Sequence, residues 1–281
     1  MTIAITGVTG NLGGFVASRL AEAGVQTIHL ARSPERAKVY PNANLMQASY
    51  ENSPRVVAAL QGVEVLFMVS AKEHPDRLAQ HLAFVDAAAQ AGVRQIVYTS
   101  FYQATPESTF TLARDHAATE AYIREKGLAY TFLRDNFYLE FFLGLCLENG
   151  EIRGPAGNGK VSAVSRKDVA AVAVEVLKNP QQWENQILNM TGPKELTMSD
   201  LTKRVSKTLG REIAYIPETV EEAYQSRKAW PAQDWEYDSW VSTYTAIQSG
   251  ELAEVSLDIE RVLGRPGHSL TDLLKDIDIK E

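Results

Sequence analysis

Short apolar runs alternate with apolar residues at helical spacing along the first half of the chain. The runs predict buried strands over residues 3–6, 27–31, 44–48, 63–69, 95–100 and 129–133. Helical spacing, capping residues and closing glycines predict helices over residues 12–23, 33–39, 54–60, 78–91 and 113–126. Strands that alternate with helices in this way predict a doubly wound parallel sheet with helices on both faces, an α/β architecture.

The composition is that of an ordinary globular protein with one large domain or a large and a small one. The chain has 281 residues, of which 45% are hydrophobic and 22% charged. A formal charge of -7 argues against non-specific DNA binding, which depends on basic patches. Cys146 is the only cysteine, which excludes an internal disulfide and fits a reducing cytoplasm.

No signal peptide and no apolar run of bilayer length is visible in the sequence. The five histidines show no ligand spacing, so we expect no metal site. We therefore expect a cytoplasmic protein, monomeric or homodimeric, whose partner is a small molecule and neither a nucleic acid nor a membrane.

The stretch ITGVTGNLGG places evenly spaced glycines between a predicted strand and a predicted helix. Gly7 permits a tight turn, Gly10 lets the backbone approach a pyrophosphate, and Gly13 lets the helix pack close to the strand. The phosphates would lie against free N–H groups at the helix N-terminus. This context favours a dinucleotide site over a glycine-rich turn without a ligand. The predicted cofactor residues of this loop are Gly7, Thr9, Gly10, Asn11, Leu12 and Gly13.

The end of the second predicted strand favours NADP(H) over NAD(H). NAD-binding domains usually place an acid there to hold the ribose hydroxyls, whereas this chain has Ala31-Arg32-Ser33-Pro34. Arg32 is suited to a 2′-phosphate, with help from the Ser33 hydroxyl. The alternative is that Arg32 is a solvated surface arginine.

Several segments together resemble one family over nearly the whole chain. They are the glycine loop TGVTGNLGG, YTSFYQA (98–104), ARDHAATEAYIREKGLAYTFLRDNFYLEFF (113–142), GNGKVSAVSRKDVAAVAVEVL (157–177) and RVLGRPGHSLTDLL (261–274). These segments resemble the NmrA-like group of atypical short-chain dehydrogenases, which includes type 2 NADPH quinone oxidoreductases and triphenylmethane reductase. The resemblance implies an NADP-binding Rossmann core over residues 1–135, with a return segment at about 157–190. A smaller substrate-binding domain would take residues 136–156 and 191–281.

The absence of a catalytic pair agrees with the resemblance, because NmrA-like enzymes of this kind also lack it. Most short-chain dehydrogenases use Tyr-x-x-x-Lys at the start of the helix after the fifth strand. Counting back from Glu120, the lysine position falls on His116 and the tyrosine position on Leu112. Reduction of simple ketones needs a proton at oxygen and becomes disfavoured. A quinone needs less help, because hydride addition gives a stabilised anion that water can protonate.

The remaining candidates come from strand ends, where ligands of open parallel sheets bind. His116 and Tyr102 are the candidate catalytic residues. The alternative for His116 is a histidine on the surface of a helix, and the alternative for Tyr102 is one wall of an aromatic pocket. Thr99 and Ser100 are cofactor candidates that also fit a strand-capping role. The other cofactor candidates beside these strand ends are Val69, Ser70, Ala71, Phe101, Asn136, Phe137 and Tyr138.

Aromatic residues supply the substrate candidates. A run after the sixth strand and a second segment, AWPAQDWEYDSWVSTY, suit either a pocket wall or a small core. Asp168 resembles a family position where the chain returns to the sheet, with a structural role at a helix start. The predicted substrate residues are Phe141, Phe142, Trp230 and Trp235.

Two functions fit these observations. The first is an NADPH-dependent reductase of quinones or similar flat, conjugated acceptors, working by direct hydride transfer. The second is a regulator that senses NADP(H) without turnover and acts through protein partners. The aromatic run after the sixth strand favours the enzyme.

Overall fold

The computed structural model describes residues 1–276 and divides the chain into two compact units. The first unit comprises Met1–Phe101, Asp115–Arg134 and Val169–Leu188. The second comprises Tyr102–Arg114, Asp135–Asp168 and the chain from Asn189 onward. Residues 277–281 of the predicted smaller domain lie outside the described part. The predicted domain boundaries stay a prediction.

A seven-stranded sheet with the order β3-β2-β1-β4-β5-β6-β9 organises the first unit. The pairs from β3 through β5 are parallel, and Ile3 of β1 pairs with Thr27 on one side and Val65 on the other. The order 3-2-1-4-5-6 defines a doubly wound Rossmann-type sheet, so the predicted fold class is confirmed. The strands are β1 (Ile3–Ile5), β2 (Thr27–Ala31), β3 (Ala43–Gln47), β4 (Val65–Met68), β5 (Gln95–Phe101), β6 (Ala129–Asp135) and β9 (Gln186–Met190).

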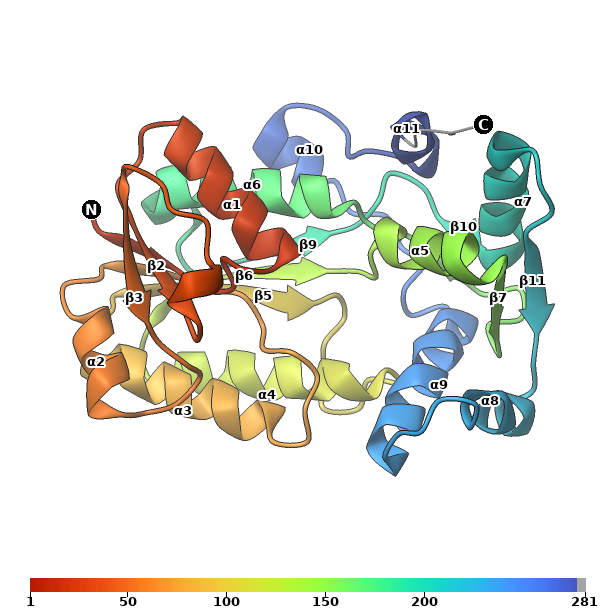
Figure 1. Ribbon diagram of the computed structural model, residues 1–281, viewed down its shortest axis with the longest axis horizontal. Helices are drawn as coiled ribbons and strands as arrows, with labels where there is room; N and C mark the ends of the chain where they lie inside the picture. Colours follow the sequence, from red (N-terminus) through yellow and green to blue (C-terminus); the bar gives the residue numbers. More distant parts are fainter. Residues whose placement is uncertain (277–281) are drawn as a thin grey trace. The chain divides into compact units, whose positions relative to one another are not determined.

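Helices cover both faces of this sheet. Figure 1 shows α1 and α6 along one face and α2, α3 and α4 along the other. Helices on both faces are needed to bury a parallel sheet whose strands are apolar on both sides. The helices are α1 (Asn11–Glu22), α2 (Pro54–Leu60), α3 (Arg77–Gln90), α4 (Thr111–Glu125) and α6 (Arg166–Lys178), with a 3-10 turn η2 at Pro180–Trp183.

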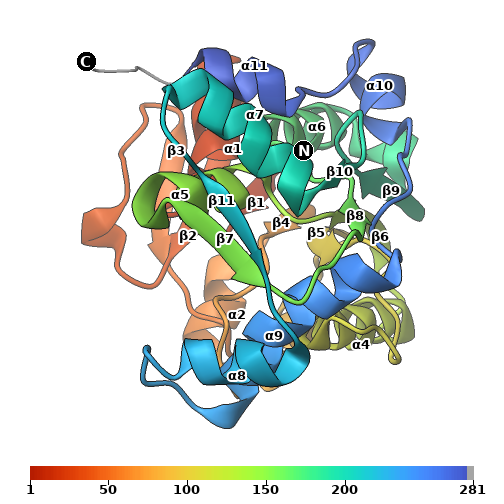
Figure 2. The ribbon, with the colours of Figure 1, turned by 90° about the vertical axis from the view of Figure 1, so that its right-hand side faces the viewer.

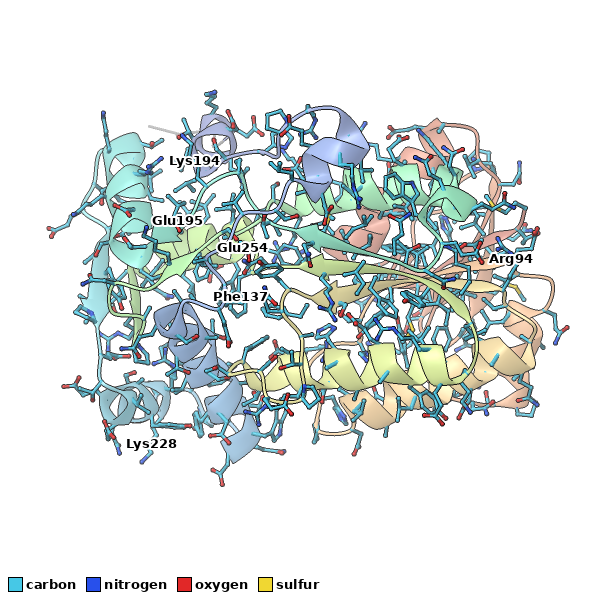
Figure 3. All side chains as sticks on the ribbon, turned by 180° about the vertical axis from the view of Figure 1, so that it is seen from behind. Arg94, Phe137, Lys194, Glu195, Lys228 and Glu254 are labelled. Carbon is cyan, nitrogen blue, oxygen red and sulfur yellow. The ribbon has the colours of Figure 1, made fainter. Side chains whose placement is uncertain are left out.

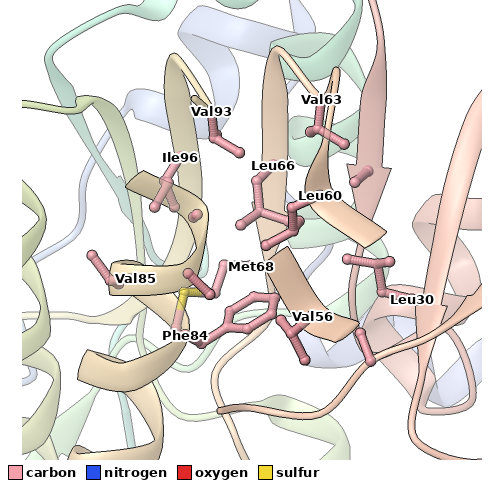
Figure 4. Packing of buried hydrophobic residues seen from close by; sticks show 14 of the residues in the cluster. Leu30, Val56, Leu60, Val63, Leu66, Met68, Phe84, Val85, Val93 and Ile96 are labelled. Carbon is pink, nitrogen blue, oxygen red and sulfur yellow. The ribbon is translucent and has the colours of Figure 1, made fainter. Parts of the chain in front are cut away.

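A tight apolar core joins the sheet to α2 and α3 (Figure 4). Leu66 and Met68 of β4 and Ile96 of β5 are fully buried, as is Val56 of α2. The ring of Phe84 on α3 is 1% exposed and fills the space beside Val56 in Figure 4. Complete burial of such side chains stabilises the fold by roughly 1.5–3 kcal/mol each and holds the strand ends in fixed positions.

The predicted helix over residues 33–39 is wrong. Only a single 3-10 turn, η1 (Pro34–Arg36), forms there. Val39 is 76% exposed, and no residue of η1 is buried. Without an apolar face to bury, the helix signals at Ser33 and Pro34 cannot offset the entropic cost of nucleating a helix.

The second unit contains two small sheets and the remaining helices. In Figure 2, β7 and β11 run side by side, and these strands are parallel. The other pair, β8 and β10, is antiparallel. The strands are β7 (Glu151–Gly154), β8 (Lys160–Val161), β10 (Leu196–Thr197) and β11 (Ala214–Pro217). The helices are α5 (Leu139–Asn149), α7 (Met198–Leu209), α8 (Val220–Arg227), α9 (Asp234–Ser249), α10 (Asp258–Leu263) and α11 (Leu270–Lys275).

Asp168 ties the C-terminal segment to the start of α6. Its buried carboxylate accepts hydrogen bonds from Arg265 Nη2 at 2.9 Å and from His268 Nδ1 at 2.7 Å. The geometry agrees with the structural role predicted for Asp168 at a helix start. Among residues 1–276, no helix is long and apolar enough to span a membrane.

Candidate cofactor site

The glycine loop is shaped by two close approaches of its own backbone. Gly7 adopts φ +66°, and its carbonyl accepts a hydrogen bond from Gly10 N–H at 2.9 Å, which closes the turn. A Cβ on Gly13 would lie 2.4 Å from the Gly7 oxygen and 2.6 Å from the Thr6 oxygen. Only glycine therefore lets α1 begin this close to β1, as the spacing of the motif predicts.

The N-terminus of α1 has donor groups that no side chain caps. Gly10 is the N-cap residue, and it makes no side-chain cap hydrogen bond. The first turn contains no acidic residue. Thr9 and Asn11 are exposed beside it. Uncapped N–H groups and the positive end of the helix dipole suit a phosphate at this position.

A cleft of about 770 Å³ opens at the carboxyl ends of β1, β2 and β4. These strands meet where the strand order reverses from β1 to β4, which is the place where open α/β sheets bind ligands. The cleft brings together ten residues predicted from the sequence, namely Gly7, Thr9, Gly10, Asn11, Leu12, Gly13, Arg32, Val69, Ser70 and Ala71.

Other lining residues were missed by the sequence reasoning. They come from segments that contain no motif: the chain after β3, the chain after β4, and α3. The only sequence signal for them is the polar sequence that follows β3 and β4. They include Ser49, Tyr50, Glu51, Lys72, Glu73, His74 and Gln80.

Arg32 lies exposed at the cleft immediately after β2. Its backbone carbonyl accepts a hydrogen bond from Gln47 Nε2 at 3.1 Å, which ties the loop after β2 to the end of β3. Lys72 and His74 also line the cleft and bring further basic groups. An exposed guanidinium beside a helix N-terminus is suited to a second phosphate group.

The end of β5 is held by internal hydrogen bonds. Thr99 Oγ1 accepts from Ser70 N–H at 2.7 Å. Ser100 Oγ donates to Glu120 at 2.6 Å, and Glu120 in turn receives two hydrogen bonds from Arg134. All of the strand through Phe101 is buried. These contacts match the capping alternative for the two hydroxyls, and their contact with a cofactor stays a prediction.

His116 is buried inside the first unit and not on its surface, with 6% of its area exposed. Its Nε2 lies 2.8 Å from Arg77 Nη2, and its Nδ1 lies 2.9 Å from the Tyr98 hydroxyl. Burial, with a further contribution from the Arg77 cation, lowers the pKa of His116 well below its ordinary value. The imidazole is therefore neutral, and a direct contact with an acceptor stays a prediction.

Tyr102 and Asn136 belong to the second unit, where both are buried. Tyr102 N–H donates to the Asp135 carbonyl at 3.0 Å, and burial raises the pKa of its phenol. Asn136 Nδ2 donates to Ser162 Oγ at 3.0 Å and to the Leu252 carbonyl at 2.9 Å. The Asn136 side chain thus fixes this loop from within.

Asp135 and Tyr138 form a buried pair in the same loop. The Tyr138 hydroxyl donates to one carboxylate oxygen of Asp135, and the other oxygen has no partner among the described residues. Burial raises the pKa of Asp135 to about 7 and raises that of Tyr138. Arg166 stacks over the Tyr138 ring at 4.8 Å.

The predicted cofactor residue Phe137 and the predicted substrate aromatics have very different environments, and contact of Phe137 with a cofactor stays a prediction. Phe137, labelled in Figure 3, packs edge-on against Phe110 at 5.0 Å and against Phe142 at 6.1 Å. Phe142 is fully buried and packs in the core of the second unit, whereas Phe141 is 40% exposed. Trp230 is 54% exposed, and Trp235 is half-buried with its indole N–H donated to Gln233. Contact of Phe141, Phe142, Trp230 and Trp235 with a substrate stays a prediction.

Among the described residues, no group of three histidine, cysteine or carboxylate side chains is placed to hold a metal ion. The glycine turn, the uncapped N-terminus of α1 and Arg32 give a cleft on a Rossmann-type sheet that is suited to phosphate groups. Proteins of this class bind dinucleotides across the same edge.

Comparison with known proteins assigns the family. The model of the NmrA-like family matches residues 1–232, and the chain belongs to this family. It is 30% identical to quinone oxidoreductase 2 of Escherichia coli over 277 residues, with 96% of each chain covered.

Two solved structures share the fold over nearly the whole chain. An NADPH-dependent quinone oxidoreductase of Escherichia coli, complexed with NADPH, has a TM-score of 0.90 at 30% identity, covering 97% of this chain and 98% of that one. The Citrobacter sp. triphenylmethane reductase complexed with NADP(H) has a TM-score of 0.85 at 31% identity, covering 98% and 99%.

Proposed function

We propose that this protein is an NADPH-dependent reductase that delivers hydride to a quinone or a similar flat, conjugated acceptor. The observation that carries the proposal is the cleft at the switch point of the sheet. It combines the glycine turn, an uncapped helix N-terminus and Arg32. The quinone oxidoreductase and the triphenylmethane reductase, which cover nearly the whole chain, support the same reading.

The residues of the cleft fit an NADP(H) molecule. Gly10 presents no side chain toward the α1 N-terminus, so a pyrophosphate can approach the backbone N–H groups there. Gly13 provides the close packing that directs these groups toward the cleft. Arg32 holds the 2′-phosphate in this proposal. When bound, the nicotinamide supplies a hydride, which is two electrons and one proton.

Hydride transfer to such an acceptor requires little acid–base catalysis by the chain. By the sequence count, Leu112 and His116 stand where most short-chain dehydrogenases have the tyrosine and lysine. Leu112 cannot donate a proton, and His116 is neutral and engaged with Arg77. This arrangement favours acceptors whose reduced anion is already stabilised, such as quinones and cationic dyes. The chain then contributes proximity and orientation.

The test is oxidation of NADPH by the purified protein with a panel of acceptors. The panel holds benzoquinone, a naphthoquinone, a triphenylmethane dye and a simple aldehyde, with NADH run in parallel. The proposal predicts saturable turnover with the quinones or the dye, little with the aldehyde, and a preference for NADPH. Tight NADPH binding without turnover on any acceptor would replace the reductase by the NADP(H)-sensing regulator.

A further inference from the structure

The cleft wall after β4 has its backbone N–H groups bound by side chains from other elements. Val69 N–H donates to Thr6 Oγ1 at 2.9 Å, and Ser70 N–H donates to Thr99 Oγ1 at 2.7 Å. Thr6 follows β1 and Thr99 lies in β5, so the two strands that flank β4 hold the first two residues of the wall.

The third residue of the wall, Ala71, is held through both groups of its backbone. Its N–H donates to His81 Nε2 at 2.8 Å, and its carbonyl accepts from Arg77 Nε at 3.0 Å. Arg77 and His81 lie one turn apart on α3, so they reach the same peptide from one helix face. Neither residue lines the cleft itself, whereas Ala71 does.

The hydrogen bonds define the tautomer of His81. Because Ala71 N–H is a donor, His81 Nε2 must be an unprotonated acceptor. His81 Nδ1 lies 3.0 Å from Thr119 Oγ1, whose own hydroxyl donates to the Asp115 carbonyl at 2.7 Å. Thr119 is therefore the acceptor in the pair, and the ring proton resides on Nδ1. Only the neutral ring satisfies both partners.

The surroundings keep the ring neutral. His81 has no exposed surface, and burial, followed by the Arg77 cation, lowers its pKa to about 3. From α4, Asp115 faces Arg77 at 3.3 Å and offsets that charge rather than pairing with the imidazole. The other titratable groups beside the ring are Tyr50 after β3, Tyr98 on β5 and His116 on α4.

We propose that His81 and Arg77 are positioning residues for the cofactor, which hold the Ala71 peptide so that the cleft wall is already formed when the dinucleotide arrives. The inference rests on the proposed binding of NADP(H) in this cleft. A wall that must be ordered during binding costs conformational entropy, and a wall fixed beforehand does not. His81 thus acts on affinity through Ala71, without touching the ligand.

The test compares two variants of His81 and one matched control. His81→Leu removes the acceptor and fills a similar volume, while His81→Gln offers an amide oxygen near the position of Nε2. The control is His29→Leu, because His29 is also buried in the first unit but, among residues 1–276, its side chain hydrogen-bonds only to Thr27 Oγ1, at 3.0 Å, on its own strand. Each variant is measured for amide hydrogen exchange at residues 69–71 without cofactor, and for NADPH affinity by fluorescence titration.

We expect His81→Leu to speed exchange at Ala71 and to weaken NADPH binding by about ten-fold or more. His81→Gln should recover much of both effects, and His29→Leu should leave both unchanged. In turnover, the KM for NADPH should rise more than kcat falls.

Three outcomes would overturn the proposal. One is an Ala71 amide that stays protected from hydrogen exchange in His81→Leu. Another is fast exchange with NADPH affinity equal to that of the wild type. The third is equal effects from His81→Leu and His29→Leu. If the wild type itself fails to bind NADPH, the proposed function fails, and the exchange data then show separately whether His81 holds the wall.

Discussion

The α-carbon of Gly13 lies so close to Gly7 that a Cβ there would be 2.4 Å from the Gly7 carbonyl oxygen. Gly13→Ala must push α1 away from β1, because the nearest atom is a backbone oxygen that cannot swing aside. We expect NADPH affinity to fall by at least about ten-fold, or about 1.4 kcal/mol, and the melting temperature to fall as well. Titration and thermal denaturation measure both effects.

Gly144 provides the matched control for this substitution. It lies within α5, and a Cβ there would meet nothing within 4 Å. Gly144→Ala should therefore raise stability by up to about 1 kcal/mol, because alanine favours the helix. A Gly13→Ala protein that binds NADPH as well as the wild type does would contradict the close-packing role of Gly13.

Arg32→Ala tests the choice between the two dinucleotides. We expect NADPH binding to weaken by about 1–3 kcal/mol, the contribution of a charge-assisted contact, and NADH binding to change little. Isothermal titration with both cofactors gives the comparison. Arg36→Ala removes an equal charge four residues further along the chain, outside the cleft lining, and should leave NADPH binding nearly unchanged. Equal losses for NADPH and NADH in Arg32→Ala would refute the 2′-phosphate assignment.

His116→Ala tests whether the buried histidine supports the fold. The substitution leaves Arg77 Nη2 and the Tyr98 hydroxyl without the ring nitrogens that they contact. We expect the free energy of unfolding to fall by about 1–3 kcal/mol, with slower turnover. His116→Gln should restore part of the stability, because its amide oxygen can accept from Arg77. Unchanged stability in His116→Ala, measured by urea denaturation, would show that this network contributes nothing.

The raised pKa of Asp135 predicts that the stability of the protein depends on pH. Its folded pKa of about 7 lies above that of an unfolded carboxyl, near 3.9. The folded protein therefore holds a proton that the unfolded chain has lost, and stability falls as pH rises between about 4 and 7. Asp135→Asn cannot ionise, so its stability relative to the wild type should rise across this window, by up to about 1.4 kcal/mol per pH unit, and then level off.

Asp86 gives the opposite sign as a control. Lys126, at 2.6 Å, lowers the pKa of this carboxylate, with help from the Tyr122 hydroxyl. Its contribution to stability is therefore present at neutral pH and lost as pH falls through the folded pKa. Asp86→Asn should be less stable than the wild type near pH 7, and the difference in stability should disappear in acid.

For Asp135→Asn, a difference in stability that does not change with pH would rule out a buried ionisation at Asp135.

The sequence predicts most of the fold because apolar patterning and burial agree along the strands. Val65 to Met68, for example, forms a continuous apolar run and is completely buried. The pattern is less informative where helix signals lack an apolar face, as at Pro34 and Ser33. Strand ends also shift by one or two residues, because the pairing of the last peptide depends on neighbouring strands that the local sequence does not specify.

The cofactor site likewise has residues that the sequence predicts and residues that it does not. The glycine loop and Arg32 are local motifs, so spacing alone indicates their chemistry. The contacts of His116 and the hydrogen bonds to the Ala71 peptide join residues that are far apart in the sequence. Arg77 and Tyr98, for example, come from separate elements that only folding brings together. The sequence shows five histidines without showing which of them are buried against a cation.

The most direct test of the central claim uses NADPH deuterated at C4 of the nicotinamide, on either face, mixed with the protein and a naphthoquinone in a stopped-flow instrument. The account predicts rapid loss of the NADPH absorbance under single-turnover conditions, slowed by deuterium on one face only. That result would show hydride transfer from a cofactor held in one orientation. NADPH that binds but stays reduced, with no isotope effect on either face, would contradict the claim that this protein is a reductase.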